Sequence, residues 1–300
     1  MVVLPPRLRA GDRVRLVSPA SYPSSELLAA SVRTLEGWGL VVEVGKHALD
    51  RHGYMAGLDE DRLADLNDAY RDPGVRALFA TRGGAGAYRI ADDLDFDAVR
   101  ADPKPLVGFS DITNLHLALW RECQVAGVHG YLDGERSAAA TRSLLMDGER
   151  AVLRRDPSAL TAAVEVAGVA RGHLVGGHLG TVAWTVGAGL PSLDGAILFL
   201  EEPRVVGLGH VDRHLTQLMR SGSLRGLRGV ALGRFLGFEG YVDRDWDVVD
   251  VLRDRLGSLG VPVIGGIDVG HGDAPLSLPL GPVAELDADA GSLKVSPAVR

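Results

Sequence analysis

Ser110 stands at a point where the sequence changes from the pattern of a strand to that of a helix. Residues 106–109 form a short apolar run, of the size of a buried strand, and Ile112 and Leu115 then begin a helical spacing. A serine at such a junction presents its hydroxyl above the sheet edge, beside backbone N–H groups that a helix start leaves free. The position suits a nucleophile, and it equally suits an ordinary helix N-cap.

Two further residues with catalytic potential follow predicted strands. Glu201 ends the apolar run 195–200, and His271 lies between Gly270 and Gly272, which leave room for an imidazole to reach a partner. Each residue also has an ordinary interpretation, as a capping or surface acid and as a loop histidine. Together with Ser110 they occur in the order nucleophile, acid, base, and these are the parts of a Ser–His–acid triad.

A glycine-rich segment, RGGAGAYR at residues 82–89, follows another predicted strand. Its glycines would let backbone N–H groups approach an anion. The dinucleotide fingerprint Gly-x-Gly-x-x-Gly fails, because its third glycine position holds Arg89. The loop is therefore interpreted as an anion or oxyanion nest, or as a tight turn that needs glycine, and we expect no cofactor.

Histidine pairs raise the possibility of a metal site. His210 and His214 lie at i and i+4 of a predicted helix, but Val211 stands where a zinc protease has its general-base glutamate. His173 and His178 flank two glycines, with no further cysteine or histidine nearby. We expect no metal, and a metallohydrolase that uses His210 and His214 remains an alternative.

The composition is that of a globular protein with no affinity for polyanions. The chain has 300 residues, 46% of them hydrophobic and 24% charged, with a net charge of −7 and 5% aromatic residues. A negative charge and few aromatics argue against nucleic acid or an anionic membrane as partner. The first residues do not resemble a signal peptide, and no apolar run is long enough to span a bilayer, so we expect a cytoplasmic protein.

Strands and helices alternate through the first half, which predicts an α/β fold with a largely parallel sheet. Strands are expected at 13–17, 40–44, 75–80 and 125–129, and helices near 24–38 and 59–70. We predict a Rossmann-like or flavodoxin-like domain over residues 1–140, a linker over 141–164 with a helix at about 141–153, and a smaller β-rich domain over 165–300.

Several sequence blocks, taken together, resemble one known family. They are residues 11–19 (GDRVRLVSP), 82–89 (RGGAGAYR), 108–116 (GFSDITNLH), 176–179 (GGHL), 197–202 (ILFLEE), 212–213 (DR), 270–271 (GH) and 278–281 (LPLG). In this order they resemble the LD-carboxypeptidase family of serine peptidases, which includes muramoyl-tetrapeptide carboxypeptidases and microcin C immunity peptidases. The resemblance covers nearly the whole chain.

The resemblance implies roles for the residues singled out above. Ser110 would be the nucleophile, His271 the general base and Glu201 the acid that orients His271. The oxyanion hole would be formed by backbone N–H groups of Asp111, Gly83 and Gly84. The family further implies a triad built across the interface of the two domains, no metal or other cofactor, and a homodimer.

Three departures from the family pattern lie near the expected substrate cleft. His178 replaces the asparagine that usually follows the paired glycines, Tyr131 replaces the proline of a usual His-Gly-Pro, and residues 203–206 lack a second acid. We take Arg82, His178, Tyr131 and Arg213 as substrate-binding candidates.

The expected activity is release of a terminal D-Ala from peptidoglycan-derived tetrapeptides, a step of peptidoglycan recycling. An antibiotic-immunity peptidase that cleaves a peptidyl-nucleotide is the alternative within the same chemistry. A non-catalytic α/β ligand-binding protein, in which Ser110 only caps a helix, is the alternative of another class.

Overall fold

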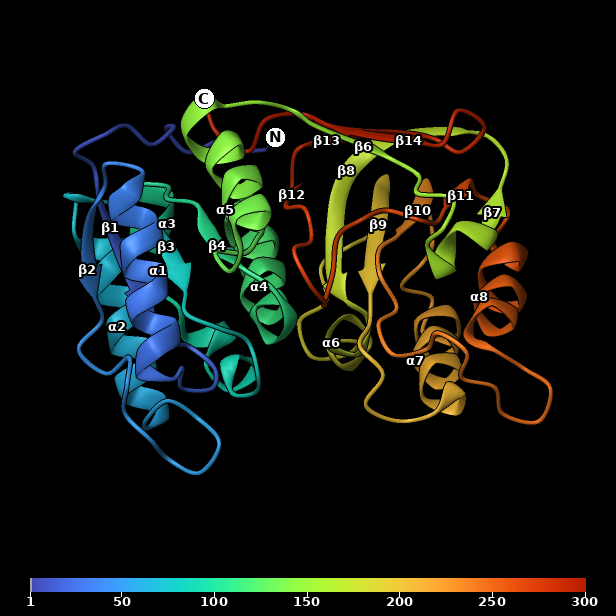
Figure 1. The fold of residues 1–300 in the computed structure, drawn as a ribbon, viewed down its shortest axis with the longest axis horizontal. Helices are drawn as coiled ribbons and strands as arrows, with labels where there is room; N and C mark the ends of the chain where they lie inside the picture. The colour runs from blue at the N-terminus through green and yellow to red at the C-terminus, as the bar shows by residue number, and fades with distance from the viewer. Residues whose placement is uncertain (1) are drawn as a thin grey trace.

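A computed structural model describes residues 2–300 as two β-sheets that stand side by side, each with its own helices (Figure 1). The first sheet has the strand order β12-β5-β4-β3-β1-β2. Its strands are β1 (Arg13–Val17), β2 (Val41–Val44), β3 (Val75–Ala80), β4 (Leu106–Gly108), β5 (Gly127–His129) and β12 (Leu278–Leu280). Strands β1 to β5 are parallel, and β12 pairs antiparallel with β5.

Five helices belong to this first half: α1 (Ser25–Gly37), α2 (Asp59–Arg71), α3 (Phe96–Ala101), α4 (Thr113–Cys123) and α5 (Glu135–Arg142). Their starts and ends have local causes. The Ser24 hydroxyl caps α1 by accepting the Leu27 N–H. The buried Lys104 ammonium donates to the carbonyls of Ala69, Tyr70 and Asp72, which the end of α2 leaves without helical partners.

The second sheet has the order β6-β14-β13-β8-β9-β10-β11-β7. Its strands are β6 (Ala151–Arg154), β7 (Glu165–Val166), β8 (Val169–His178), β9 (Ala196–Glu201), β10 (Gly229–Leu232), β11 (Val263–Ile264), β13 (Val283–Asp287) and β14 (Ser292–Val295). The central strands β8 to β11 are parallel and the flanking pairs are antiparallel. Helices α6 (Leu179–Trp184), α7 (Leu208–Arg220) and α8 (Val248–Leu256) belong to this half. The predicted fold class, a parallel-sheet α/β domain followed by a β-rich domain, is confirmed.

The segment 141–164, predicted as a linker with a helix to about residue 153, contains a strand. Helix α5 ends at Arg142, a π-helical turn follows over Ser143–Asp147, and Gly148 with φ +67° turns the chain out of it. Strand β6 then pairs with β14 and buries Ala151 and Leu153 on one face. The helix was wrong because pairing with a strand some 140 positions away along the chain overrides local helix propensity.

The two sheets meet where β8 reaches the start of α4. The backbone N–H of His178 donates to Thr113 Oγ1 at 3.2 Å. Gly177 has φ +147°, and a Cβ there would clash with the same oxygen. One core cluster includes Phe79 of the first sheet and Phe199 of the second. The helix that follows Ser110 is therefore fixed against the second sheet.

Among residues 2–300 no helix is both long enough and apolar enough to cross a membrane.

Candidate active site

Ser110 lies at a sharp turn between β4 and α4. Its φ is +62°, a left-handed conformation that costs a non-glycine residue about 1–2 kcal/mol. A 3₁₀ turn over Ser110–Ile112 leads from this residue into α4. Such strain persists only where the surrounding structure imposes it, and it is concentrated at functional sites. Within the described residues the Ser110 hydroxyl makes no hydrogen bond, so it is free to meet a ligand.

The glycine turn after β3 packs directly on Ser110. A Cβ at Gly83 would lie 2.6 Å from Ser110 Cβ and 3.0 Å from its Oγ. Gly84, with φ +111°, packs equally closely on Ser21. Only glycine permits this approach, and it brings the backbone of the turn beside the serine.

The Asp111 carboxylate fastens the far end of the glycine loop to the serine turn. Its Oδ2 accepts the Ala87 N–H at 2.8 Å, and its Oδ1 accepts from Asn114 Nδ2 at 2.9 Å. Burial raises the pKa of Asp111 to about 6. The two segments proposed to form an oxyanion hole are thus tied together by a buried side chain.

Glu201, at the end of β9, and the half-buried His271 form a carboxylate–imidazole pair. His271 Nδ1 lies 2.7 Å from Glu201 Oε2, and the His271 backbone N–H donates to the same oxygen at 3.1 Å. Glu201 is fully buried, and Gly270, with φ +128°, packs on its Cβ. Because a carboxylate only accepts, His271 carries a proton on Nδ1 and leaves Nε2 available as a base.

The charges of this pair support each other. Burial works to raise the pKa of Glu201, but the hydrogen bond and charge of His271 outweigh it and lower that pKa overall. Burial works to lower the pKa of His271, but the hydrogen bond and charge of Glu201 outweigh it and raise that pKa overall. Both directions describe a carboxylate that stabilises an imidazolium.

The nucleophile candidate and the pair come from different sheets and meet through Phe109. The Phe109 ring, next to Ser110 in the chain, contacts the His271 ring edge to face at a centroid distance of 5.2 Å. The structure therefore brings Ser110, Glu201 and His271 into one region.

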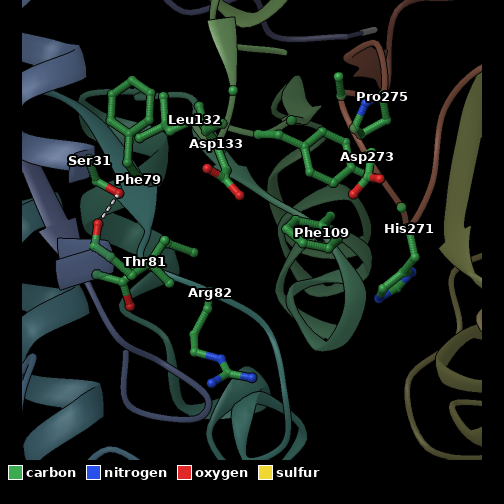
Figure 2. Close-up of a pocket in the computed structure, with 18 residues that line it drawn as sticks. Ser31, Phe79, Thr81, Arg82, Phe109, Leu132, Asp133, His271, Asp273 and Pro275 are labelled. Atoms are coloured by element: carbon green, nitrogen blue, oxygen red, sulfur yellow. Dashed lines mark hydrogen bonds between the residues drawn. The ribbon is translucent and has the colours of Figure 1, made fainter. Parts of the chain in front are cut away.

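A cavity of about 420 Å³ opens beside His271 and Phe109 (Figure 2). Figure 2 shows Arg82 on one side, with Asp133 and Asp273 on the opposite side. Within residues 2–300 the Arg82 guanidinium has no hydrogen-bond or ion-pair partner. The cavity thus offers one free cation to a ligand.

Tyr131 forms part of the aromatic wall of this cavity. Its ring packs on Phe109 at a centroid distance of 4.2 Å, and its hydroxyl lies 3.0 Å from His129 Nε2. The Tyr131 side chain is buried, and burial raises the pKa of its phenol.

The other two substrate-binding candidates are placed differently. His178 does not line the cavity, and its ring nitrogens contact Thr181 and Glu202. Arg213 is exposed on α7 and does not line the cavity either. The sequence analysis did not single out Glu202, which contacts His178 in the structure. The signal for it was a second acid directly after a buried strand, because the side chains of successive residues in an extended chain point to opposite sides.

A second cavity, of about 490 Å³, is lined by Ala85, Asn114, Arg121 and Trp184 among others. Its arginine is already occupied, since it donates to Glu122, to Asp92 and to the Gly189 carbonyl. The first cavity is therefore the better match for an anionic ligand next to His271.

The histidines considered for metal binding form no complete ligand set. The rings of His210 and His214 are 4.3 Å apart, and His214 is buried against Trp184. Burial lowers the pKa of His214 to about 4. Throughout the described chain, no third histidine, cysteine or acid joins these two at a common point.

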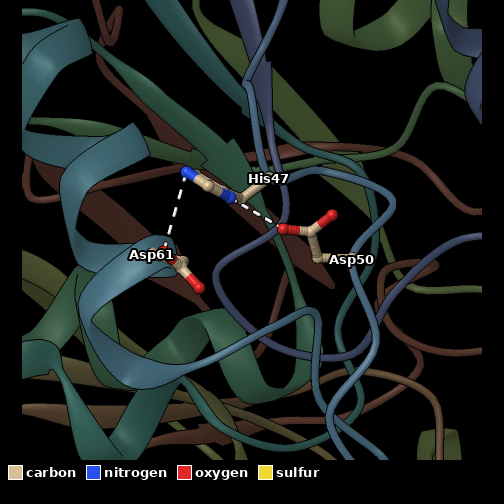
Figure 3. Close-up of side chains that lie close together, drawn as sticks. All are labelled: His47, Asp50 and Asp61. Atoms are coloured by element: carbon tan, nitrogen blue, oxygen red, sulfur yellow. Dashed lines mark hydrogen bonds and ion pairs between the residues drawn. The ribbon is translucent and has the colours of Figure 1, made fainter.

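A cluster that the sequence did not indicate is formed by His47, Asp50 and Asp61 (Figure 3). His47 Nδ1 lies 2.7 Å from Asp50, and Nε2 lies 3.7 Å from Asp61. The hydrogen bond to Asp50 raises the pKa of His47. Since the two nitrogens face different carboxylates, the arrangement suits an imidazolium bridging two acids rather than three ligands around one metal ion.

A strained serine beside a glycine turn, and a carboxylate–imidazole pair whose ring packs on the neighbouring Phe109, supply groups that the active site of a hydrolase can use. Residues 14–130 match the LD-carboxypeptidase N-terminal domain, and residues 171–286 match the LD-carboxypeptidase C-terminal domain. The chain belongs to the LD-carboxypeptidase family and is a carboxypeptidase.

Individual relatives agree with this assignment. A Streptomyces coelicolor protein provisionally named a carboxypeptidase is 41% identical, with 97% of this chain and 96% of the relative covered. The murein tetrapeptide carboxypeptidase of Pseudomonas aeruginosa is 30% identical, with 92% and 94% covered. The microcin C7 self immunity protein in complex with adenosine monophosphate shares the fold at a TM-score of 0.85 and 20% identity, with 98% of each chain covered.

Proposed function

We propose that this chain is a serine-type LD-carboxypeptidase with Ser110 as nucleophile, His271 as general base and Glu201 as the acid that orients His271. The observation that carries the proposal is the 2.7 Å Glu201–His271 contact, with its histidine ring packed on the residue that precedes a strained Ser110.

In the proposed reaction Ser110 Oγ attacks the carbonyl before the C-terminal residue, while His271 Nε2 takes the hydroxyl proton. Backbone N–H groups of Asp111, Gly83 and Gly84 stabilise the oxyanion. His271 then returns the proton to the leaving amine as the amide bond breaks. Water, deprotonated by His271, finally cleaves the Ser110 ester and frees the shortened peptide.

For the substrate we propose a murein tetrapeptide that loses its terminal D-Ala. The Pseudomonas relative is named a murein tetrapeptide carboxypeptidase, at 30% identity over almost the whole chain. The free Arg82 guanidinium beside the cavity suits the terminal carboxylate that every carboxypeptidase substrate presents. Arg213, exposed on α7 away from the cavity lining, has less support as a second anchor.

A peptidyl-nucleotide is the second candidate substrate, as in an antibiotic-immunity peptidase. The observation in its favour is the aromatic wall of Phe109 and Tyr131, on which a nucleobase could stack. The structural similarity to the microcin C7 self immunity protein adds only a shared fold, at 20% identity.

A direct comparison of kcat/KM on a murein tetrapeptide and on a peptidyl-nucleotide analogue separates the two candidates. We expect D-Ala release from the tetrapeptide, with KM raised about 10- to 100-fold by Arg82→Ala, the loss of one charge-assisted hydrogen bond. Arg82→Lys serves as the matched control that keeps the charge. Cleavage of the nucleotide analogue alone would reverse the ranking.

We propose a cytoplasmic homodimer whose triad is divided between an N-terminal α/β lobe, residues 1–140, and a C-terminal lobe, residues 165–300. In the 141–164 segment, β6 adds a strand to the second sheet, and β12 returns to the first, so the lobes are interlocked. Light scattering of the purified protein tests the dimer, and cell fractionation tests the location.

A further inference from the structure

Glu202 is a buried acid that the proposed mechanism does not use. It is 5% exposed, its Oε2 accepts the Gly180 N–H at 2.9 Å, and the same oxygen lies 3.3 Å from His178 Nε2. Successive residues of an extended chain point to opposite sides, so Glu201 holds His271 while Glu202 holds His178. The end of β9 therefore carries two carboxylate–imidazole pairs.

The two pairs are in direct contact. The His178 and His271 rings meet edge to face, with centroids 5.9 Å apart and an interplanar angle of 64°. The other titratable or charged groups around them are Tyr131, Arg234, His129 from β5, and His210 and His214 from α7. Of the two carboxylates near His271, only Glu202 lacks a role in the proposed reaction.

The proton of the second pair has a defined place. His178 caps α6, and its Nδ1 accepts the Thr181 backbone N–H at 3.1 Å. An accepting ring nitrogen carries no proton, so neutral His178 is protonated on Nε2, the atom that faces Glu202. With a second proton on Nδ1, the ring N–H would point at the Thr181 backbone N–H, and the capping hydrogen bond would be lost.

A proton taken up by this pair therefore goes to Glu202. Burial lowers the pKa of His178, in agreement with the capping geometry, and burial raises the pKa of Glu202 to about 7. The negative charge beside His271 is present above that pH and lost below it.

We propose that Glu202, held by His178, is a positioning residue that fixes the His271 ring and supplies a negative charge that favours its imidazolium form. The inference rests on the proposed role of His271 as general base. Ionised Glu202 helps to raise the pKa of His271, and neutral Glu202 does not. Glu202 touches no reacting atom and acts only through His271.

The test is the pH dependence of kcat/KM on a murein tetrapeptide, with His271 also titrated directly by NMR on ¹³C-histidine-labelled protein. Glu202→Gln keeps the shape and an acceptor for Gly180 but removes the charge. We expect the acidic limb and the His271 titration both to shift to lower pH. Glu285→Gln, an exposed position on β13, removes a charge elsewhere and should shift neither.

His178→Asn keeps a helix-capping side chain but removes the ring that contacts His271. Neutral His178 carries no charge, so the negative charge near His271 comes from Glu202, and we expect the double variant to shift the His271 titration no further than Glu202→Gln alone. Should Glu202→Gln fail to fold, an unchanged His271 titration in His178→Asn overturns the inference.

A Glu202→Gln profile that superimposes on that of the parent, with only a lower Tm, would also overturn it and leave Glu202 as a helix cap. The NMR titration does not depend on turnover. A shifted titration combined with full activity of Ser110→Ala would refute the proposed function but leave the pairing intact.

Discussion

The two halves of the proposed site are built in different ways. Ser110 is positioned by neighbours in the chain, because β4, a 3₁₀ turn and α4 follow one another within residues 106–123. Glu201 and His271 are 70 positions apart and meet only because β9 and the loop before β12 lie side by side in the folded protein. The site thus combines a strained local turn with a pair that depends on tertiary structure.

This difference separates what each half contributes. The local half of the site is the Ser110 turn between β4 and α4. Its backbone is strained, at φ +62° on Ser110, and its hydroxyl is unpaired. The long-range half is the Glu201–His271 pair. It acts electrostatically, because the fully buried Glu201 carboxylate raises the pKa of His271. Substitutions in the local half should change reactivity through geometry, and those in the long-range half should change it through charge.

The largest effect is expected in the local half, for Ser110→Ala. Removal of the nucleophile should lower kcat for D-Ala release by about 10⁴-fold or more, while the Tm stays close to that of the parent. Ser258→Ala, at an exposed position beyond α8, is the control and should retain full activity. Near-parental turnover by Ser110→Ala would leave Ser110 as a helix cap.

In the long-range half, Glu201→Gln should lower kcat by about 10³- to 10⁴-fold, because a neutral amide no longer stabilises the imidazolium or fixes its tautomer. The measurement is kcat at the pH optimum, with circular dichroism to verify the fold. A loss smaller than tenfold would show that the Glu201–His271 pair has a structural role only.

Gly83→Ala tests whether the glycine turn belongs to the local half. The added Cβ would lie 2.6 Å from Ser110 Cβ and must displace the turn or the serine. Loss of an oxyanion donor typically costs about 10²- to 10³-fold in kcat, and we expect a loss of that size. Gly209→Ala on α7, with open space around it, is the control and should be neutral. Equal activities for the two variants would exclude the turn from the site.

The smallest expected effect is the change of kcat/KM with pH, which depends on the titration of His271 in the long-range half. The pKa of His271 lies above its ordinary 6.5, and only the neutral imidazole is a base. At pH 6.5 less than half of His271 is neutral, so kcat/KM should be at least about twofold below its high-pH plateau. A profile that is flat from pH 5 to 8 would contradict His271 as the base.

The sequence predicted best what depends on nearby residues. The strand at 13–17 and the strand–Ser–helix junction at Ser110 follow from local periodicity and are found in the structure. The fold class followed from the alternation of strands and helices. The helix expected to residue 153 failed, because β6 pairs with the distant β14.

Contacts between residues that are distant in the chain could not be predicted from the sequence pattern. Strand β12 returns to pair with β5 in the first sheet, a contact between residues 278–280 and 127–129 that no periodicity indicates. The same holds for the contact of Glu202 with His178 and for the tie between Asp111 and Ala87. Residue types indicated the candidates for a triad, but only the fold gives the distance between Glu201 and His271.

The most direct test of the central claim is labelling of the folded protein with a fluorophosphonate, which reacts covalently with activated serines, followed by peptide mapping. We predict one adduct, on Ser110, that is lost in His271→Ala, because the unassisted hydroxyl is a weak nucleophile. An active enzyme that acquires no adduct on Ser110, or acquires it equally without His271, would contradict the claim that Ser110 and His271 act together.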